Sequence, residues 1–223
     1  MVKVVAFFKR KPGITVEEFD RHWSTRHADL VRRLPGLRRY VQNPTLPSGY
    51  RRREPVYDGV AEAWFDDGEA LRISGASREY AAVKADEPGF IDGASLGSLI
   101  TEEVVVVDGR DAAGAVKLIA FLNRRPDLEP EAFRAYWRGS HGPLAAKVPG
   151  IERYVQCHVA PGIYRAGRQP IFDGVPISWF RDAETLRASG TTPEYEAVRT
   201  DEANFLAPRP LPFVIASGRE VAI

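Results

Sequence analysis

The chain has 223 residues, 44% of them hydrophobic and 27% charged, which is typical of a globular protein with one or two cores. Its 31 lysine and arginine residues nearly balance 30 aspartate and glutamate residues, so we expect no nucleic-acid partner. No stretch reaches the roughly eighteen apolar residues of a membrane span, so no membrane partner is expected either. The single cysteine, Cys157, excludes an intrachain disulfide and indicates a reducing compartment, which predicts a cytoplasmic protein.

The first half of the chain predicts alternating strands and helices. The apolar, β-branched run at 2–8 is typical of a buried strand. Thr15 and Glu18 form a capping-box pattern that begins a helix, and Pro35-Gly36 ends it. The later elements are strands at 37–42 and 56–65, short helices at 69–73 and 78–85, and a last strand at 99–107. The predicted order is therefore βαββαβ.

The second half repeats the first. Shifts of 114 and then 115 residues superpose the two halves over nearly their whole length. The matching pairs include Phe19 with Phe133, Trp23 with Trp137, His27 with His141, Pro35-Gly36 with Pro149-Gly150, Tyr40-Val41-Gln42 with Tyr154-Val155-Gln156, Asp58-Gly59 with Asp173-Gly174, and Asp86-Glu87 with Asp201-Glu202. We therefore predict one domain at 1–108, a linker at 109–114 and a second domain at 115–223.

A βαββαβ domain of the α+β class carries its helices on one face of the sheet. If the other face is apolar, as Val4, Val41 and the valine run at 104–107 suggest, it has to be covered. A second copy of the same sheet in the same chain would cover it, which predicts that two sheets close a barrel within one polypeptide. Further pairing of two such units into a homodimer is left open.

His27 and His141 are the first candidates for chemistry. Each follows a tryptophan by four residues on the apolar face of a helix, so its side chain is expected to point toward the sheet. A histidine there can act as general acid or base near neutral pH. A core histidine bonded to a backbone carbonyl would give the same pattern. In the second copy, Gly142-Pro143 predicts that the helix ends or kinks after His141.

Tyrosine and glutamine on the second strand are candidates for contacts to a ligand. Tyr40 and Gln42 are two residues apart, as are Tyr154 and Gln156, so each pair shares one face of its strand. Such a pair could orient a carbonyl or phenol oxygen in an apolar pocket. The two side chains could equally bond to each other at the edge of the sheet.

The third strand adds a difference between the halves. Glu62 and Trp64 share one strand face, and the second copy has Ile177 and Trp179 at these positions. Glu62 is therefore either exposed to solvent or a sign that the halves differ in function. The candidate substrate-binding residues are Trp23, Gln42, Glu62, Trp64, Trp137, Gln156 and Trp179.

Several motifs of catalysis and cofactor binding are absent from the sequence. It contains no dinucleotide fingerprint, phosphate-binding loop, nucleophile elbow or zinc-protease motif. With four histidines and no close histidine–carboxylate cluster, we expect no metal site and no cofactor. Haem stays open as an alternative, because one histidine is enough as an axial ligand.

The repeated residues resemble the EthD domain family of ferredoxin-like, dimeric α/β-barrel proteins. The resemblance is carried by Phe19, Trp23 and His27 with the Pro-Gly and Tyr-Val-Gln segments that follow, and it recurs in the second half. It implies tandem ferredoxin-like α+β domains that form an intramolecular dimeric α/β barrel. From lactone isomerases among the relatives, it also implies the catalytic pairs His27 with Tyr40 and His141 with Tyr154.

We therefore expect a cofactor-independent enzyme for a small hydrophobic molecule, an aromatic, lactone or polyketide-like compound. A histidine would move a proton at a carbon next to a carbonyl while tyrosine or glutamine holds the oxygen, as in an isomerase, cyclase or lyase. This hypothesis predicts a histidine-lined cavity beneath the first helix of each half. The alternatives are a non-catalytic ligand-binding or accessory protein of a degradative or oxidoreductase pathway, and a haem- or oxygen-using oxidoreductase.

Overall fold

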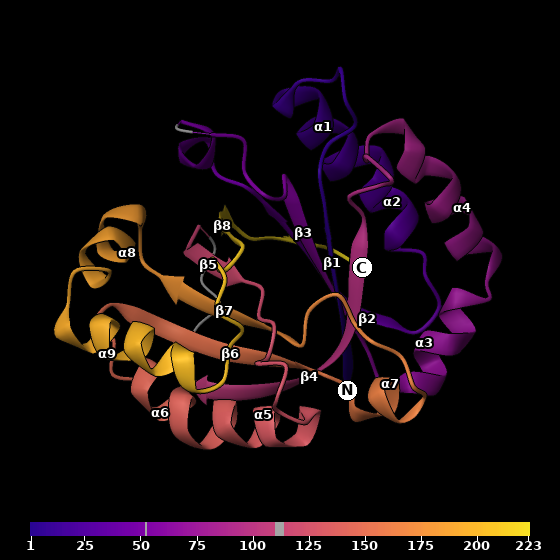
Figure 1. Ribbon diagram of the computed structural model, residues 1–223. Helices are drawn as coiled ribbons and strands as arrows, with labels where there is room; N and C mark the ends of the chain where they lie inside the picture. Colours follow the sequence, from indigo (N-terminus) through magenta and orange to yellow (C-terminus); the bar gives the residue numbers. More distant parts are fainter. Residues whose placement is uncertain (52, 110–113) are drawn as a thin grey trace. The chain divides into compact units, whose positions relative to one another are not determined.

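The computed structural model describes residues 1–51, 53–109 and 114–223 (Figure 1). They group into two compact units, one of Met1–Ile100 with Ala216–Ile223 and the other of Thr101–Ile215. Each unit thus includes a short segment from the other sequence repeat. Most of the predicted linker at 109–114 lies outside the described residues, because 110–113 are not described.

The first unit contains the strand order β4-β1-β3-β2-β9. Strand β3 (Gly59–Phe65) pairs antiparallel with β1 (Val2–Phe8) and β2 (Leu37–Pro44). Strand β9 (Arg219–Val221) extends the edge of β2. Strand β4 (Gly97–Val107), next to β1 in this order, runs from the first unit into the second.

The second unit repeats this order as β8-β5-β7-β6-β4. Strand β7 (Gly174–Phe180) pairs antiparallel with β5 (Val116–Ala120) and β6 (Ile151–Val159). The segment of β4 from Thr101 extends the edge of β6, and β8 is Phe213–Ser217. Each ferredoxin-like sheet is therefore completed at the same edge by a strand from the other repeat.

The helices of both units also follow one plan. In the first unit they are α1 (Val16–His22), η1 (Trp23–His27), α2 (Ala28–Val31), α3 (Gly68–Gly75) and α4 (Arg78–Asp86). In the second they are α5 (Pro130–Tyr136), η4 (Trp137–His141), α6 (Gly142–Ala145), α7 (Pro161–Arg165), α8 (Ala183–Ser189) and α9 (Pro193–Asp201). Short 3₁₀ turns η3 (Glu87–Gly89) and η5 (Glu202–Asn204) follow α4 and α9. The predicted strands and helices are confirmed to within a few residues.

The predicted capping box begins helix α1. The Thr15 side chain accepts from Glu18 N at 3.1 Å, and the Glu18 carboxylate accepts from Thr15 N at 2.8 Å. We expect Thr15→Ala to lower the free energy of unfolding by about 1 kcal/mol, measured by urea denaturation. Helix α5 supplies a matched control, because its N-cap Glu129 makes no side-chain capping bond, so Glu129→Ala should change stability little. Equal losses in both variants would contradict this role of Thr15.

Aromatic clusters fill the space between helices and sheet in each unit. In the first unit the cluster consists of Phe8, Phe19, Trp23, Phe90 and Ile91. In the second it consists of Leu122, Phe133, Trp137, Phe205 and Leu206. In Figure 1, α5, α6 and α9 of the second unit lie along one side of β6. These clusters fix the helices that carry His27 and His141 against the sheet.

The two faces of the first sheet differ from the prediction at one residue. Val41 lies opposite Glu62 on the face away from the helices, as expected. Val4 was predicted on that face, but it packs with Val2 and Val31 on the helical side, so this prediction is wrong. Strand alternation places Val5, which is fully buried, on the other face instead.

Candidate functional site

Each helical histidine is bonded to an aspartate at the end of a distant helix. His27 Nδ1 lies 3.1 Å from Asp86 Oδ2 on α4, and His141 Nδ1 lies 2.9 Å from Asp201 Oδ2 on α9. A carboxylate can only accept, so Nδ1 carries the proton and Nε2 keeps a free lone pair. The alternative of a bond to a backbone carbonyl is therefore wrong. We call these pairs the His–Asp dyads.

The second ring nitrogen of each dyad is available. Nε2 of His27 and of His141 makes no hydrogen bond to a described residue. Neither is among the buried polar atoms that lack a partner, so each keeps contact with solvent although the residues are only 6% and 7% exposed. Burial lowers the pKa of both imidazoles more than the aspartates raise it. Both histidines are thus neutral at pH 7.

Other residues also bind the two dyad carboxylates, and these residues differ between the units. His22 Nε2 lies 3.0 Å and Arg26 Nε 2.9 Å from Asp86. Burial raises the pKa of Asp86, but the hydrogen bonds from His22 and His27 outweigh it, and the pKa lies below its usual value. In the second unit, Tyr136 and Asn204 donate to Asp201 at 2.6 and 3.0 Å. Both carboxylates are therefore held ionised.

Each histidine is the last residue of a π-helical turn, Trp23–His27 or Trp137–His141. Such turns are frequent at functional sites. The main-chain carbonyl of each tryptophan accepts from the side-chain amide of Gln42 or Gln156, at 2.7 and 2.9 Å. The predicted end or kink at Gly142-Pro143 is thus a π turn that precedes Gly142, and the chain continues as helix α6.

The predicted tyrosines lie in a network with tryptophan and glutamine. Tyr40 Oη accepts from Trp23 Nε1 at 3.1 Å and from Gln42 Nε2 at 3.3 Å. Tyr154 has the same two bonds, at 3.2 and 3.3 Å. Burial raises the pKa of both phenols to about 12, so both keep their protons. The structure therefore joins Tyr40 to Gln42 and Trp23, but no hydrogen bond joins it to His27.

Different residues orient the glutamine amides in the two units. The sequence did not predict a role for either partner residue at the site. Arg219 Nε donates to Gln42 Oε1 at 2.7 Å, and Asp20 holds the same guanidinium at 2.7 Å. In the second unit, His158 Nε2 donates to Gln156 Oε1 at 2.9 Å. Both partners turn the amide nitrogen toward tyrosine and tryptophan.

His158 should make the second unit sensitive to acid. Its Nδ1 is buried without a partner, and burial, helped by Arg134 and Arg138, lowers its pKa from 6.5 to about 3. Between these pH values only the unfolded chain binds the proton, so this residue stabilises the fold above pH 6.5 and less as pH falls. We expect a loss of about 1.4 kcal/mol per pH unit from this group. Urea denaturation at pH 7 and pH 5 should show a smaller loss in His158→Gln, and an unchanged loss would contradict the prediction.

Three predicted substrate contacts lie on the other face of the sheets. Glu62 is 1% exposed and forms an ion pair with Lys3 at 2.5 Å, so the alternative of a solvent-exposed Glu62 is wrong. Trp64 lies under the Lys3 ammonium at 4.6 Å, and in the second unit Trp179 packs on Lys117 at 4.9 Å. Strand alternation thus separates Glu62, Trp64 and Trp179 from the dyads.

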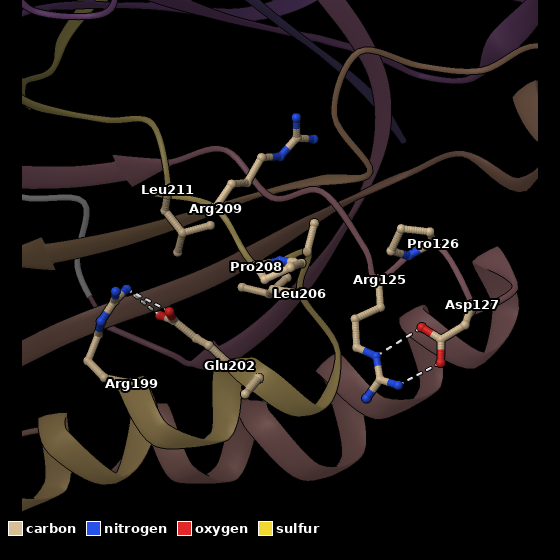
Figure 2. A pocket seen from close by; sticks show the side chains of 11 residues that line it. Arg125, Pro126, Asp127, Arg199, Glu202, Leu206, Pro208, Arg209 and Leu211 are labelled. Carbon is tan, nitrogen blue, oxygen red and sulfur yellow. Dashed lines mark hydrogen bonds and ion pairs between the residues drawn. The ribbon is translucent and has the colours of Figure 1, made fainter.

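Two of the depressions on the surface of the described residues lie beside helices α9 and α1. One, of 440 Å³, lies beside α9, where Arg125 pairs with Asp127 and Arg199 with Glu202 (Figure 2). The other, of 380 Å³, lies beside α1 and is lined in part by His22 and Phe90. His27, Tyr40, His141 and Tyr154 line neither of them. The cavity predicted beneath the first helices is thus not one of these two.

The described residues offer neither a metal-binding cluster nor a membrane-spanning helix. No group of three or more histidine, cysteine, aspartate or glutamate side chains among them is placed to hold a metal ion. No helix in this part of the chain combines the length and the apolar character needed to cross a bilayer.

A model of the EthD domain matches residues 11–94 and 125–209. The chain belongs to the EthD domain family. The two matches coincide with the two sequence repeats, so the duplication is one of a whole EthD domain. A comparison with curated protein sequences gives no match.

Solved structures with TM-scores above 0.5 share the fold of this EthD chain. An anthrone oxidase-like protein is 12% identical with a TM-score of 0.66, over 100% of this chain and 93% of that one. A chlorite dismutase variant from Candidatus Nitrospira defluvii is 12% identical with a TM-score of 0.53, over 97% and 91%. An EthD family protein from Bacillus halodurans C-125 is 26% identical over 45% of this chain and 95% of that one, with a TM-score of 0.37. The predicted fold class, tandem ferredoxin-like α+β domains of the dimeric α/β-barrel type, is confirmed.

Proposed function

We propose that this EthD protein is a cofactor-independent enzyme that transfers a proton on a hydrophobic aromatic, lactone or polyketide-like compound. The observation that supports it is the His–Asp dyad, present in both units with Nδ1 bonded to a carboxylate and Nε2 free. In this arrangement the aspartate fixes the tautomer and orientation of the imidazole, which is what a general base requires. An isomerase, cyclase or lyase would use this chemistry.

In the proposed reaction, His27 Nε2 removes a proton from a carbon next to the carbonyl of the substrate. The imidazolium that forms is stabilised by the ionised Asp86, 3.1 Å from Nδ1. Tyr40 would donate to the carbonyl oxygen, because it keeps its proton and both of its described hydrogen bonds are ones that it accepts. His141, Asp201 and Tyr154 would play these parts in the second unit.

A second candidate is an oxidoreductase, suggested by the names of the anthrone oxidase-like and chlorite dismutase structures. An anthrone has an acidic carbon–hydrogen bond, and the same base could form a carbanion that reacts with oxygen. The haem version has less support, because His22 is the only histidine that lines either described depression, and its Nε2 is bonded to Asp86. Oxygen consumption and the visible absorption spectrum distinguish these versions.

Proton exchange with solvent tests the proposal on any bound compound that has a hydrogen on a carbon next to a carbonyl, whatever product the enzyme makes from it. Lactones, phenols, aromatic ketones and polyketide-like compounds are first screened for a rise in the melting temperature of the protein. Compounds that bind are then incubated in D₂O, and ¹H NMR follows the hydrogens next to the carbonyl. We expect the protein to accelerate their exchange above the rate in buffer. Bound compounds that neither exchange nor consume oxygen would show a non-catalytic binding protein.

A further inference from the structure

The 380 Å³ depression in the first unit is built mainly from one side of α1 and η1. The residues that line it are Ile14, Glu18, Arg21, His22, Thr25, Arg26, Gly89 and Phe90. Its volume is in the range of small-molecule sites. None of the predicted catalytic residues lines it, so it needs an explanation of its own.

Most free hydrogen-bonding groups in this depression are donors. The Arg21 guanidinium has no hydrogen bond or ion pair to a described residue, and Arg26 uses only Nε, on Asp86. His22 donates to the same carboxylate from Nε2, so Nδ1 of the neutral ring is an acceptor and adds no donor. The acceptors are largely engaged, since Asp86 has three partners and Glu18 caps helix α1. An anionic group with several acceptor oxygens would match these donors.

Beside the donors lies an apolar surface. Phe90 stacks on the His22 ring at 4.7 Å with an interplanar angle of 17°, and Ile14 also lines the depression. Phe90 itself is fully buried, so a planar apolar body would cover the exposed parts of Ile14 and of the His22 ring that Phe90 supports. Arg21 and Arg26 would then face the charged end of such a molecule.

The second repeat has no charged residue at the matching positions. At the positions of Glu18, Arg21, His22, Thr25 and Arg26 it has Ala132, Ala135, Tyr136, Gly139 and Ser140. The phenylalanine is kept, because Phe205 matches Phe90. This group of charged and polar residues is therefore specific to the first unit, although both units have the same fold and each has a His–Asp dyad.

We propose that this depression binds a small aromatic carboxylate, with Arg21 and Arg26 on the carboxylate and with His22 and Ile14 against the ring. The inference does not depend on the proposed proton transfer, since binding can occur without turnover. It assigns the two EthD copies different tasks, because only the first has this site.

Titration of the full-length protein with sodium benzoate, followed by the histidine signals in ¹H–¹³C NMR, tests the proposal. The His22 signal is assigned with the His22→Gln variant. We expect a saturable shift of the His22 signal and little change at His141 and His158. Arg21→Ala should weaken binding about tenfold or more. Arg209→Ala, which removes an exposed charge beside the other depression, should leave the affinity unchanged.

Two further compounds test the contributions of the carboxylate and of the ring separately. Benzyl alcohol lacks the carboxylate and inorganic phosphate lacks the ring, so each should bind at least about tenfold more weakly than benzoate. The proposal is overturned if benzoate leaves the His22 signal unmoved, or if Arg21→Ala binds as tightly as the wild type. It is also overturned if Arg209→Ala weakens binding as much as Arg21→Ala, or if phosphate binds as tightly as benzoate.

Discussion

Replacement of both His27 and His141 by glutamine is expected to slow the catalysed hydrogen exchange about 10²- to 10⁴-fold, because each dyad loses its base. The same NMR assay in D₂O measures the effect on the substrate that the screen identifies. Each single variant shows how much of the activity belongs to one unit. If both units are active, either single variant should keep a substantial part of the rate.

The pH dependence separates a base from a merely structural histidine. The base acts in its neutral form, and burial lowers the pKa of both histidines below 6.5. The exchange rate should therefore reach its plateau at a lower pH than a base with the ordinary histidine pKa of 6.5 would, and fall as pH drops further. Glu129→Ala serves as a control and should keep the full rate. A double variant that retains wild-type exchange but melts at a much lower temperature would identify the histidines as structural.

Replacement of Gly174 by alanine is expected to lower the free energy of unfolding by about 3 kcal/mol. A β-carbon at this position would lie 2.3 Å from the Trp137 ring, which is fully buried and has little room to move. For a chain of this length the melting temperature should fall by roughly 6–12 °C. Differential scanning calorimetry of the purified variant measures this change.

Gly139 provides the matched control in the same unit. It lies in the π-helical turn Trp137–His141, and a β-carbon there would meet no atom within 4 Å. Gly139→Ala should therefore leave stability unchanged or raise it by about 0.5 kcal/mol, because alanine restricts the unfolded chain. If the two variants melted at the same temperature, the close approach of Trp137 to β7 would not be what requires glycine.

The sequence predicted the fold well because the repeat reports each element twice. Thr15 and Pro35-Gly36 indicated where the first helix begins and ends, and alternation indicated that Tyr40 and Gln42 share a face. Only the histidines of the dyads were predicted. Asp86 is 59 residues from His27, and packing of α4 against α2, which directly follows His27, brings them together. A signal was present, because an Asp-Glu pair stands at the same place in both repeats.

Other features depend on geometry that local patterns do not encode. The spacing of Trp23 and His27 fits an α-helix and a π-helical turn equally well. Arg219 is 177 residues from Gln42, so no local rule links them. Glu62 was assigned to the ligand site because the second copy has an isoleucine at this position, but the strand places Glu62 on the far face with Lys3.

The exchange of edge strands between the repeats has a consequence for synthesis on the ribosome. The first unit needs residues 216–223, so its β2 edge and the bond from Arg219 to Gln42 cannot form until the second repeat has been translated. The first unit is therefore completed only after all residues of the second unit have been synthesised. A nascent chain that stalls after the first repeat would expose an unpaired strand edge, the kind of surface on which polypeptides associate.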